Sequence, residues 1–486
     1  MKIFNRYSHV FAIIGILTLQ ISCKKSFLEI IPKGQQIATS TKDYEQILNA
    51  NYIVASTAGV FMGDEIVALK PFVDEYALRA QRLFRYADRI YEIDQVPDEL
   101  NSADGYIRRL YLFNKVINEV MDSQGGSEGQ KRALLAEAKA GRAICNFMLL
   151  SDFSTPYLES TALAEMGIPR IEKSDVTQTN FHRLNKQDSY AMVVKDLTEA
   201  IPDLSRLTHR RKISKLAAYF FLARVYMTMQ NFNAAKEQLD QAFLEIPKAE
   251  VPLQLYDYNV VLDPEAEGTW YPLLFGVLLA GQPLSYNNTQ VIYNIEVSAV
   301  SYVGGQANAF VMSPQTVSLF DASDKRPNLF DPIEFNGSAS LPLGMRHPIG
   351  FSTQVGASLP DLYLMRAECN ARANNLTEAV ADLETLRSKR TGTPKVNSTI
   401  ASNQQALVRF ILDERVREFT YTGLRWLDMR RLSVDPLYRD HVKLKHEVRN
   451  NTTGAVVETH TLRPERFALK FGERVLRDSR GLEENP

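Results

Sequence analysis

The chain has 486 residues, of which 45% are hydrophobic and 23% charged, and its formal net charge is −1. This length can form one large domain or two to three modules, each with a substantial core. A near-neutral balance lacks the basic excess typical of nucleic-acid binding, so we expect no nucleic-acid partner.

Residues 1–22 have the pattern of a signal peptide. Lys2 and Arg6 precede an apolar stretch at residues 10–19, which is shorter than the roughly 20 residues that a bilayer-spanning helix needs. Cys23 follows directly, where a bacterial lipoprotein carries its lipid. We predict removal of residues 1–22 and lipidation of Cys23. A secreted protein with an unrelated cysteine is the alternative, because a glutamine stands three residues earlier, where an aliphatic residue is usual.

Helical patterns are present in the first half of the chain. An amphipathic pair is expected at residues 106–120 and 130–152, and the second helix opens with a possible capping box of Ser127 and Gln130. Residues 192–200 predict a further helix, because a proline follows closely.

Two later segments have the spacing of tetratricopeptide units. Residues 219–247 carry the clearer copy, and residues 363–390 carry a more degenerate one. The small residues in such a unit let two antiparallel helices approach closely. We therefore predict a helical scaffold that is interrupted between the two copies.

The interruption, residues 252–359, is rich in Gly, Pro, Asn, Ser and Tyr. Within it, residues 291–297 favour a short strand, and the remainder is typical of long loops. Long loops on a rigid helical frame often carry function, so we expect part of a binding surface here.

The sequence predicts neither a metal site nor a disulfide. The seven histidines have no ligand spacing, and we expect no metal and no cofactor. Cys145 and Cys369 lie in helical sequence and are predicted to be buried free thiols.

A charged segment at residues 413–431 invites a catalytic interpretation, because it combines the carboxylates Glu414, Glu418 and Asp428 with arginines. Helical spacing favours a structural one. It pairs Asp413 with Arg417, and Arg425 with Asp428, on the helix surface. We expect Trp426 to pack in the scaffold.

Several segments, in order and spacing, resemble the SusD/RagB family of outer-membrane nutrient-binding lipoproteins. They are Cys23–Glu29 with Pro32, Tyr106–Ile117, Ala136–Ala143, Asp196–Pro202, Leu222–Tyr226, Leu319–Arg326, Leu364–Glu368 and Glu414–Arg430. The resemblance implies a mostly α fold: a tetratricopeptide-like helix-pair scaffold with long irregular loop insertions. It implies one domain over residues 23–486, with helical parts at 23–247 and 361–486 and a ligand-face insertion at 248–360.

The same resemblance implies a non-catalytic lipoprotein, anchored at the surface of the outer membrane. Such a protein would bind a nutrient glycan and deliver it to a SusC-like TonB-dependent transporter. A peptide or glycoprotein ligand is the alternative within the family. A surface glycosidase, or a tetratricopeptide lipoprotein that assembles other outer-membrane proteins, is a less favoured alternative.

Sugar binding needs aromatic faces for the apolar side of the ring and polar side chains for its hydroxyl groups. Two loop groups combine these types, and the first lies where the resembling family places part of its ligand site. The ligand-binding candidates are Asp64, Glu65, Arg85, Tyr86 and Tyr91 in the first group, and Trp270, Tyr271, Tyr286, Asn287 and Tyr302 in the second. Only two tryptophans are present, which excludes an extended platform of several indoles.

Overall fold

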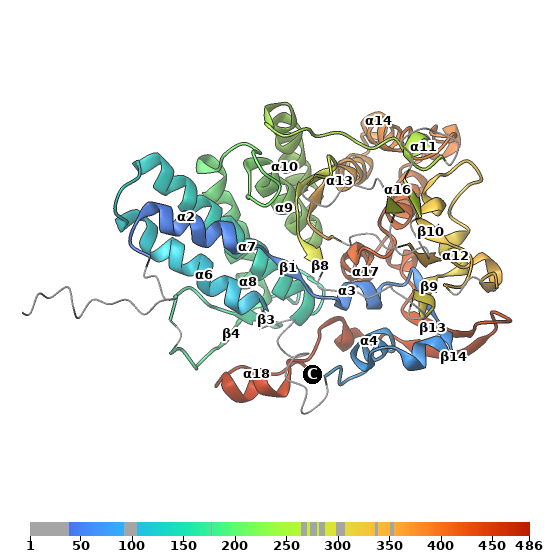
Figure 1. Cartoon of the computed structure of the whole chain (residues 1–486), viewed down its shortest axis with the longest axis horizontal. Coiled ribbons are helices and arrows are strands. Elements are labelled where there is room, and N and C mark those ends of the chain that lie inside the picture. The colour runs from blue at the N-terminus through green and yellow to red at the C-terminus, as the bar shows by residue number, and fades with distance from the viewer. Residues whose placement is uncertain are drawn as a thin grey trace, which may run out of the picture.

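Helices pack in consecutive pairs along the chain (Figure 1). The computed structural model describes residues 38–91, 105–175, 177–263, 270–272, 279–280, 287–297, 307–335, 339–349 and 354–486. Helices dominate this part of the chain, as the sequence predicts. None of the helices described there combines the length and the apolarity that crossing a bilayer demands.

The N-terminal helices form one layer, on the left of Figure 1. Helix α6 (Gly105–Glu119) packs on α7 (Glu128–Phe153), α7 packs on α8 (Lys186–Ala200), and α2 (Thr41–Ala50) contacts both α6 and α7. The capping box of Ser127 and Gln130 is confirmed. Helix α8 starts six residues before the predicted position, because Asn185 caps it by accepting the Asp188 backbone N–H.

Both predicted helix pairs are present and lie against each other. They are α9 (Lys215–Thr228) with α10 (Phe232–Glu245), and α13 (Leu359–Arg372) with α14 (Leu376–Arg387). Helix α10 packs on α13, although the loop-rich stretch separates them in the sequence. The small residues Ala223, Ala235 and Ala242 are fully buried, which is consistent with the predicted close approach.

The C-terminal helices continue this scaffold. They are α15 (Ser398–Ala401), α16 (Gln404–Phe419), α17 (Leu424–Ser433) and α18 (Glu473–Asp478). Between α16 and α17, Gly423 has a φ of +90° and touches the backbone of α3 (Ala58–Met62). A side chain at this position would be strained, so glycine permits the sharp turn.

A four-stranded sheet, which the sequence analysis did not predict, joins distant parts of the chain. Its order is β14 (Val456–Thr461), β13 (Lys445–Asn450), β2 (Ile66–Lys70) and β9 (Phe310–Met312). Strand β13 runs parallel to β2, with Val448 opposite Ala68, and β9 runs antiparallel to β2. Helix α4 (Leu78–Phe84) lies near this sheet in Figure 1.

The described residues of the loop-rich stretch form only short regular elements. The predicted strand at 291–297 is two strands, β7 (Val291–Tyr293) and β8 (Glu296–Val297), which pair with different partners. The remaining strands and short α-helices of the described chain are β1 (Val54–Ala55), β3 (Met166–Pro169), β4 (Arg183–Asn185), β5 (Tyr271–Pro272), β6 (Leu279–Ala280), β10 (Phe330–Asp331), β11 (His347–Pro348), β12 (Ala357–Ser358), α11 (Tyr258–Val261) and α12 (Pro314–Val317).

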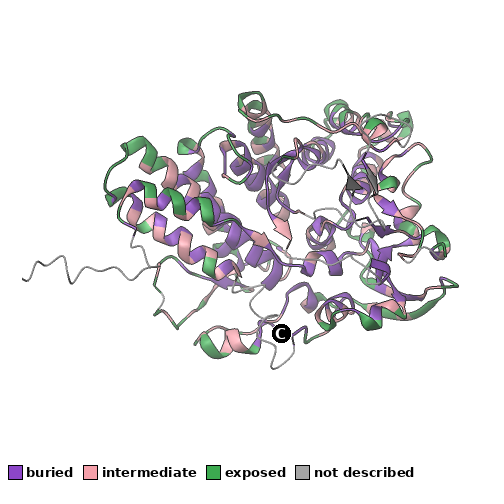
Figure 2. Cartoon of the chain, in the orientation of Figure 1, coloured by how far each residue is buried: buried purple, intermediate pink, exposed green. Residues whose placement is uncertain are grey.

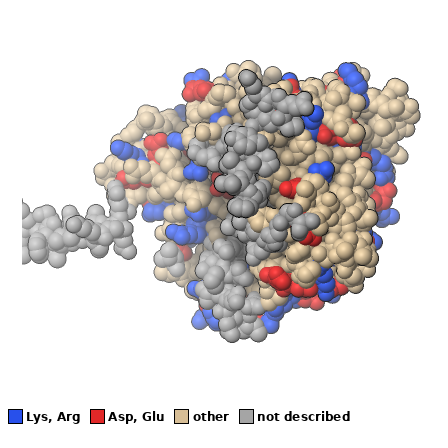
Figure 3. Space-filling view, turned by 45° about the vertical axis from the view of Figure 1, so that its right-hand side comes forward, with Lys and Arg blue, Asp and Glu red and all other residues tan. Residues whose placement is uncertain are grey.

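One main hydrophobic core runs through the helices (Figure 2), and smaller clusters lie beside the sheet and in the loop-rich stretch. Cys145 and Cys369 are buried and free in this core, as predicted. On the face shown in Figure 3, basic and acidic side chains are interspersed.

Candidate functional site

Asp64 and Glu65 of the first candidate group lie at the start of β2, inside the protein. Asp64 accepts two hydrogen bonds from the Arg425 guanidinium, at 2.5 and 2.9 Å, and one from the Lys443 backbone N–H at 2.7 Å. Burial opposes ionisation of Asp64, but the Arg425 charge outweighs it and lowers the pKa. Asp64 therefore serves as an internal counter-ion.

Glu65 is buried, with only 1% of its surface exposed, and its carboxyl oxygens have no hydrogen-bond partner among the described residues. Burial, together with the charge of Asp64, raises the pKa of Glu65 to about 8. The carboxyl group is thus mostly protonated at neutral pH. Gly63 accommodates it, since a side chain there would collide with the carboxyl group.

The aromatic members of the first group are also interior. The Tyr86 ring stacks on His446 at 4.5 Å between ring centres, and its hydroxyl donates to the Met62 carbonyl at 3.2 Å. Tyr91 is buried beneath the Arg79 guanidinium. Arg85 is partly exposed and lies 3.2 Å from Asp74. The fold brings Asp64, Glu65 and Tyr86 close together, but as interior groups.

The second group is dispersed. Trp270 is buried in a small cluster with Leu262 and Ile349, and its ring meets the edges of Tyr256 and Tyr258 at 5.1 and 5.9 Å. Asn287 is exposed. The side chain of Tyr271 is not among those described, and Tyr286, Tyr302 and the predicted lipidation site Cys23 lie outside the described residues.

The charged segment at 413–431 forms a buried network, and the predicted local pairs are wrong. Asp413 binds His441 at 2.9 Å instead of Arg417, and Arg425 binds Asp64 instead of Asp428. Arg417 pairs with Glu414 at 2.6 Å instead, and Arg425 reaches a carboxylate that is distant in the sequence. Trp426 is buried and stacks on Phe467 at 5.2 Å, in agreement with the predicted packing role.

Four carboxylates of this network are each held by more than one arginine. Glu414 lies 2.7 Å from both Arg326 and Arg387 and 2.6 Å from Arg417. Burial alone would raise the pKa of Glu414, but these charges lower it to about 2. The other three are Asp428 with Arg415 and Arg431, Glu418 with Arg326 and Arg390, and Glu368 with Arg372 and Arg431, and Arg415 also binds Asp361. The network joins α13, α16 and α17, and its role is structural.

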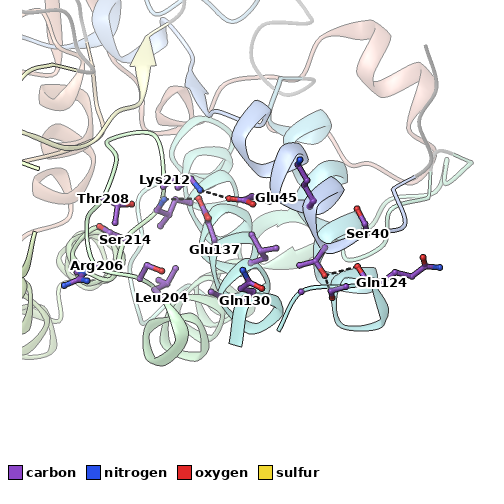
Figure 4. Close-up of a pocket in the computed structure, with 18 residues that line it drawn as sticks. Ser40, Glu45, Gln124, Gln130, Glu137, Leu204, Arg206, Thr208, Lys212 and Ser214 are labelled. Atoms are coloured by element: carbon purple, nitrogen blue, oxygen red, sulfur yellow. Dashed lines mark hydrogen bonds and ion pairs between the residues drawn. The ribbon is translucent and has the colours of Figure 1, made fainter. Parts of the chain in front are cut away.

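A cavity of about 730 Å³ opens in the N-terminal helical layer (Figure 4). Helix α2, the first half of α7, the turn at 124–126 and the loop at 204–214 line it. Thr41 fastens α2 to the turn by donating to the Gly125 carbonyl at 2.7 Å. The volume of this cavity is within the usual range for small-ligand pockets.

Glu137 and Lys212 lie on one wall of this cavity. Lys212 pairs with Glu45 at 3.2 Å, and Glu137 accepts the Ile213 backbone N–H at 3.2 Å. Burial raises the pKa of Glu137 to about 7, and the nearby Lys212 opposes the rise. Sequence reasoning missed this site. Its one local signal is a glutamate between Ala136 and Ala138 on a helix face of buried alanines.

Two family models match separate parts of the chain. The model described as the SusD family matches residues 359–468, and a SusD-like model described as starch-binding associating with the outer membrane matches residues 26–227. Together they cover more than half of the sequence. The chain belongs to the SusD/RagB family. A SusD-like protein of Bacteroides ovatus is 24% identical over 254 residues, which are 51% of this chain and 44% of that protein's length.

Solved structures share the SusD-like fold. A SusD superfamily protein of Bacteroides thetaiotaomicron superposes with a TM-score of 0.69 at 17% identity, over 92% of this chain and 100% of that one. A putative sugar binding protein of Bacteroides vulgatus gives 0.67 at 16% identity, over 93% and 99% of the two chains. A SusD-like carbohydrate binding protein of the same species gives 0.62 at 15% identity, over 91% and 97%. The mostly α, SusD-like fold class is therefore confirmed.

Proposed function

We propose that this SusD-family chain is an outer-membrane lipoprotein that binds a nutrient glycan and delivers it to a SusC-like TonB-dependent transporter. The observation that carries the proposal is the match of residues 26–227 to the model described as starch-binding associating with the outer membrane. Cys23 supplies the lipid anchor. Because anchoring holds binder and transporter on one membrane, their effective concentration is high and modest affinity suffices.

The proposed role is capture without catalysis. A glycosidase needs two carboxyl groups, one as acid and one as base or nucleophile, beside the scissile bond. The carboxylates offered by the sequence, Glu414, Glu418 and Asp428, are buried and paired with arginines. These three carboxylates are therefore held as counter-ions and do not face a substrate.

The ligand surface is proposed to lie on the loop-rich face. Asn287 and Arg85 are its accessible members, and Tyr271, Tyr286 and Tyr302 remain candidates on sequence grounds. The buried candidates, Asp64, Glu65, Tyr86, Tyr91 and Trp270, would act by shaping the loops beneath the ligand. Asn287→Ala should then weaken retention on a binding polysaccharide without changing the melting temperature. Asn397→Ala, which removes a helix cap elsewhere, is a suitable control because it should leave retention unchanged.

The transporter partner is tested by gentle extraction from cells grown on the inducing glycan. The wild-type protein should copurify with a much larger outer-membrane protein. Cys23→Ser should appear in the soluble fraction and lose that partner. Recovery of the intact lipoprotein alone, under mild detergent and growth on the glycan, would contradict the proposed delivery step.

A further inference from the structure

Among the residues that the structure describes, the charges around the N-terminal cavity leave one carboxyl group of the lining without an ion-pair partner. Three cations line the cavity, and each has an acidic neighbour. Lys212 forms an ion pair with Glu45 at 3.2 Å and Arg206 forms one with Glu250 at 2.5 Å, whereas Lys42 only influences its sequence neighbour Asp43 electrostatically. After these pairings, the remaining acid in the lining is Glu137.

Glu137 is held in a fixed position. It projects from α7, and its Oε1 accepts the Ile213 backbone N–H, which ties the helix to the loop at 204–214. In Figure 4 its carboxyl group lies beside Lys212 and faces the space between that loop and α7. Burial raises the pKa of Glu137 to about 7, so both protonation states are populated at neutral pH.

The rest of the lining suits a small hydroxylated molecule. The side chains of Gln124, Ser205 and Thr208 have no hydrogen-bond partner among the described residues and line the cavity. Amide and hydroxyl groups of this kind can both donate to and accept from sugar hydroxyls. Leu134 and Leu204 add an aliphatic patch for the apolar face of a sugar ring.

We propose that this cavity is a second binding site, which takes a small amino sugar and pairs its ammonium group with the carboxylate of Glu137. The inference rests on the proposed function only in taking the ligand to be a carbohydrate. A ligand ammonium beside Glu137 supplies the missing counter-ion, and a charge-assisted hydrogen bond is stronger than a neutral one. Binding therefore shifts Glu137 to its ionised form and releases its proton to the solvent.

The test is calorimetric titration of the full mature chain with D-glucosamine, N-acetyl-D-glucosamine and D-glucose at about pH 7, near the pKa of Glu137. Glucosamine should bind about tenfold more tightly than its N-acetyl form, which has no ammonium group. Repeating the titration in two buffers of different ionisation enthalpy should reveal proton release with glucosamine alone. This readout uses the wild-type protein and does not depend on any variant.

Glu137→Gln should abolish both the preference for glucosamine over its N-acetyl form and the proton release. Glu128→Gln, which removes an exposed carboxyl group on the same helix, should change neither. Equal binding of the three sugars, or a preference that survives in Glu137→Gln, would overturn the inference. So would equally tight binding of ethanolamine, an ammonium without a sugar ring. Polysaccharide retention, measured on the same samples, reports on the proposed function separately.

Discussion

Two acid–base clusters of this protein differ in how completely their charges are paired. In the network of α13, α16 and α17, carboxylates such as Glu414 are dry and each touches two or three guanidinium groups. In the N-terminal cavity, Glu137 touches one backbone N–H and faces an open volume of about 730 Å³. The carboxylates of the first cluster have no free side to bind a ligand. In the second cluster, Glu137 has no cationic group bound to it among the described residues.

The comparison shows that a concentration of charge in the sequence is a poor guide to function. A charge-rich run, at 413–431, is scaffold, and a single glutamate in an alanine-rich helix marks the more open site. Substitutions in the two clusters should therefore affect different properties of the protein. The network should lose stability, and the cavity should lose selectivity.

The largest expected effect is on the network. Arg415→Met leaves Asp361 and Asp428, which lie 2.6 and 2.7 Å from the guanidinium, with one arginine fewer. Removing one partner of a buried ion pair costs about 3–5 kcal/mol, because the other charge remains buried. Urea denaturation should show this loss in the free energy of unfolding. A loss below about 1 kcal/mol, the value of a surface pair, would contradict the structural role.

The pH dependence of the network comes next. The pKa of Glu414 is lowered from 4.5 to about 2 in the folded state, so its contribution to stability is complete above 4.5 and is lost as the pH falls toward 2. Glu414 alone should account for about 3 kcal/mol of this loss. The loss should persist in about 1 M salt, because buried pairs are weakly screened. If about 1 M salt abolished this pH dependence of the free energy of unfolding, exposed surface charges would be its source instead.

The cavity should respond to pH in the opposite direction. The pKa of Glu137 is raised from 4.5 to about 7, so the folded state binds the proton more tightly, and stability falls as the pH rises from 4.5 to 7. Glu137→Gln should therefore raise the free energy of unfolding by about 1–2 kcal/mol at about pH 8 and change it little at about pH 4. The gain is smaller than the full pKa shift implies, because the Glu137 side chain is partly exposed to solvent. Denaturation at both pH values measures it. No gain at the higher pH would mean that folding does not raise the pKa of Glu137.

The smallest effect is expected at the surface. Arg132 pairs with Glu128 at 3.3 Å, and their side chains are 50% and 73% exposed. Arg132→Met should change the free energy of unfolding by less than about 0.5 kcal/mol. It is the matched control for Arg415→Met, because both changes replace an arginine with methionine on a helix. A large effect here would remove the contrast between buried and exposed pairs.

Local signals predicted much of the helical frame. The capping box of Ser127 with Gln130 lies within one helical turn, and the alanine spacing of α9 and α10 lies within one helix pair, residues 219–247. Such signals are therefore present in a short stretch of sequence. The SusD-like fold followed from their order along the chain.

Long-range pairing could not be predicted in the same way. Arg425 finds Asp64 across 361 positions, and β13 is a short strand with charged residues that pairs with the distant β2. The predicted loop aromatic Trp270 is buried, because its ring packs against Tyr256 and Tyr258. Each outcome depends on tertiary neighbours that one sequence does not specify.

The central claim, capture of a glycan without cleavage, is tested most directly by affinity electrophoresis of the purified mature chain through starch and a panel of other polysaccharides, with reducing ends assayed on the same samples. The proposed function predicts retarded migration in at least one polysaccharide and no new reducing ends. Unretarded migration throughout the panel, or reducing ends that increase with protein concentration, would contradict it.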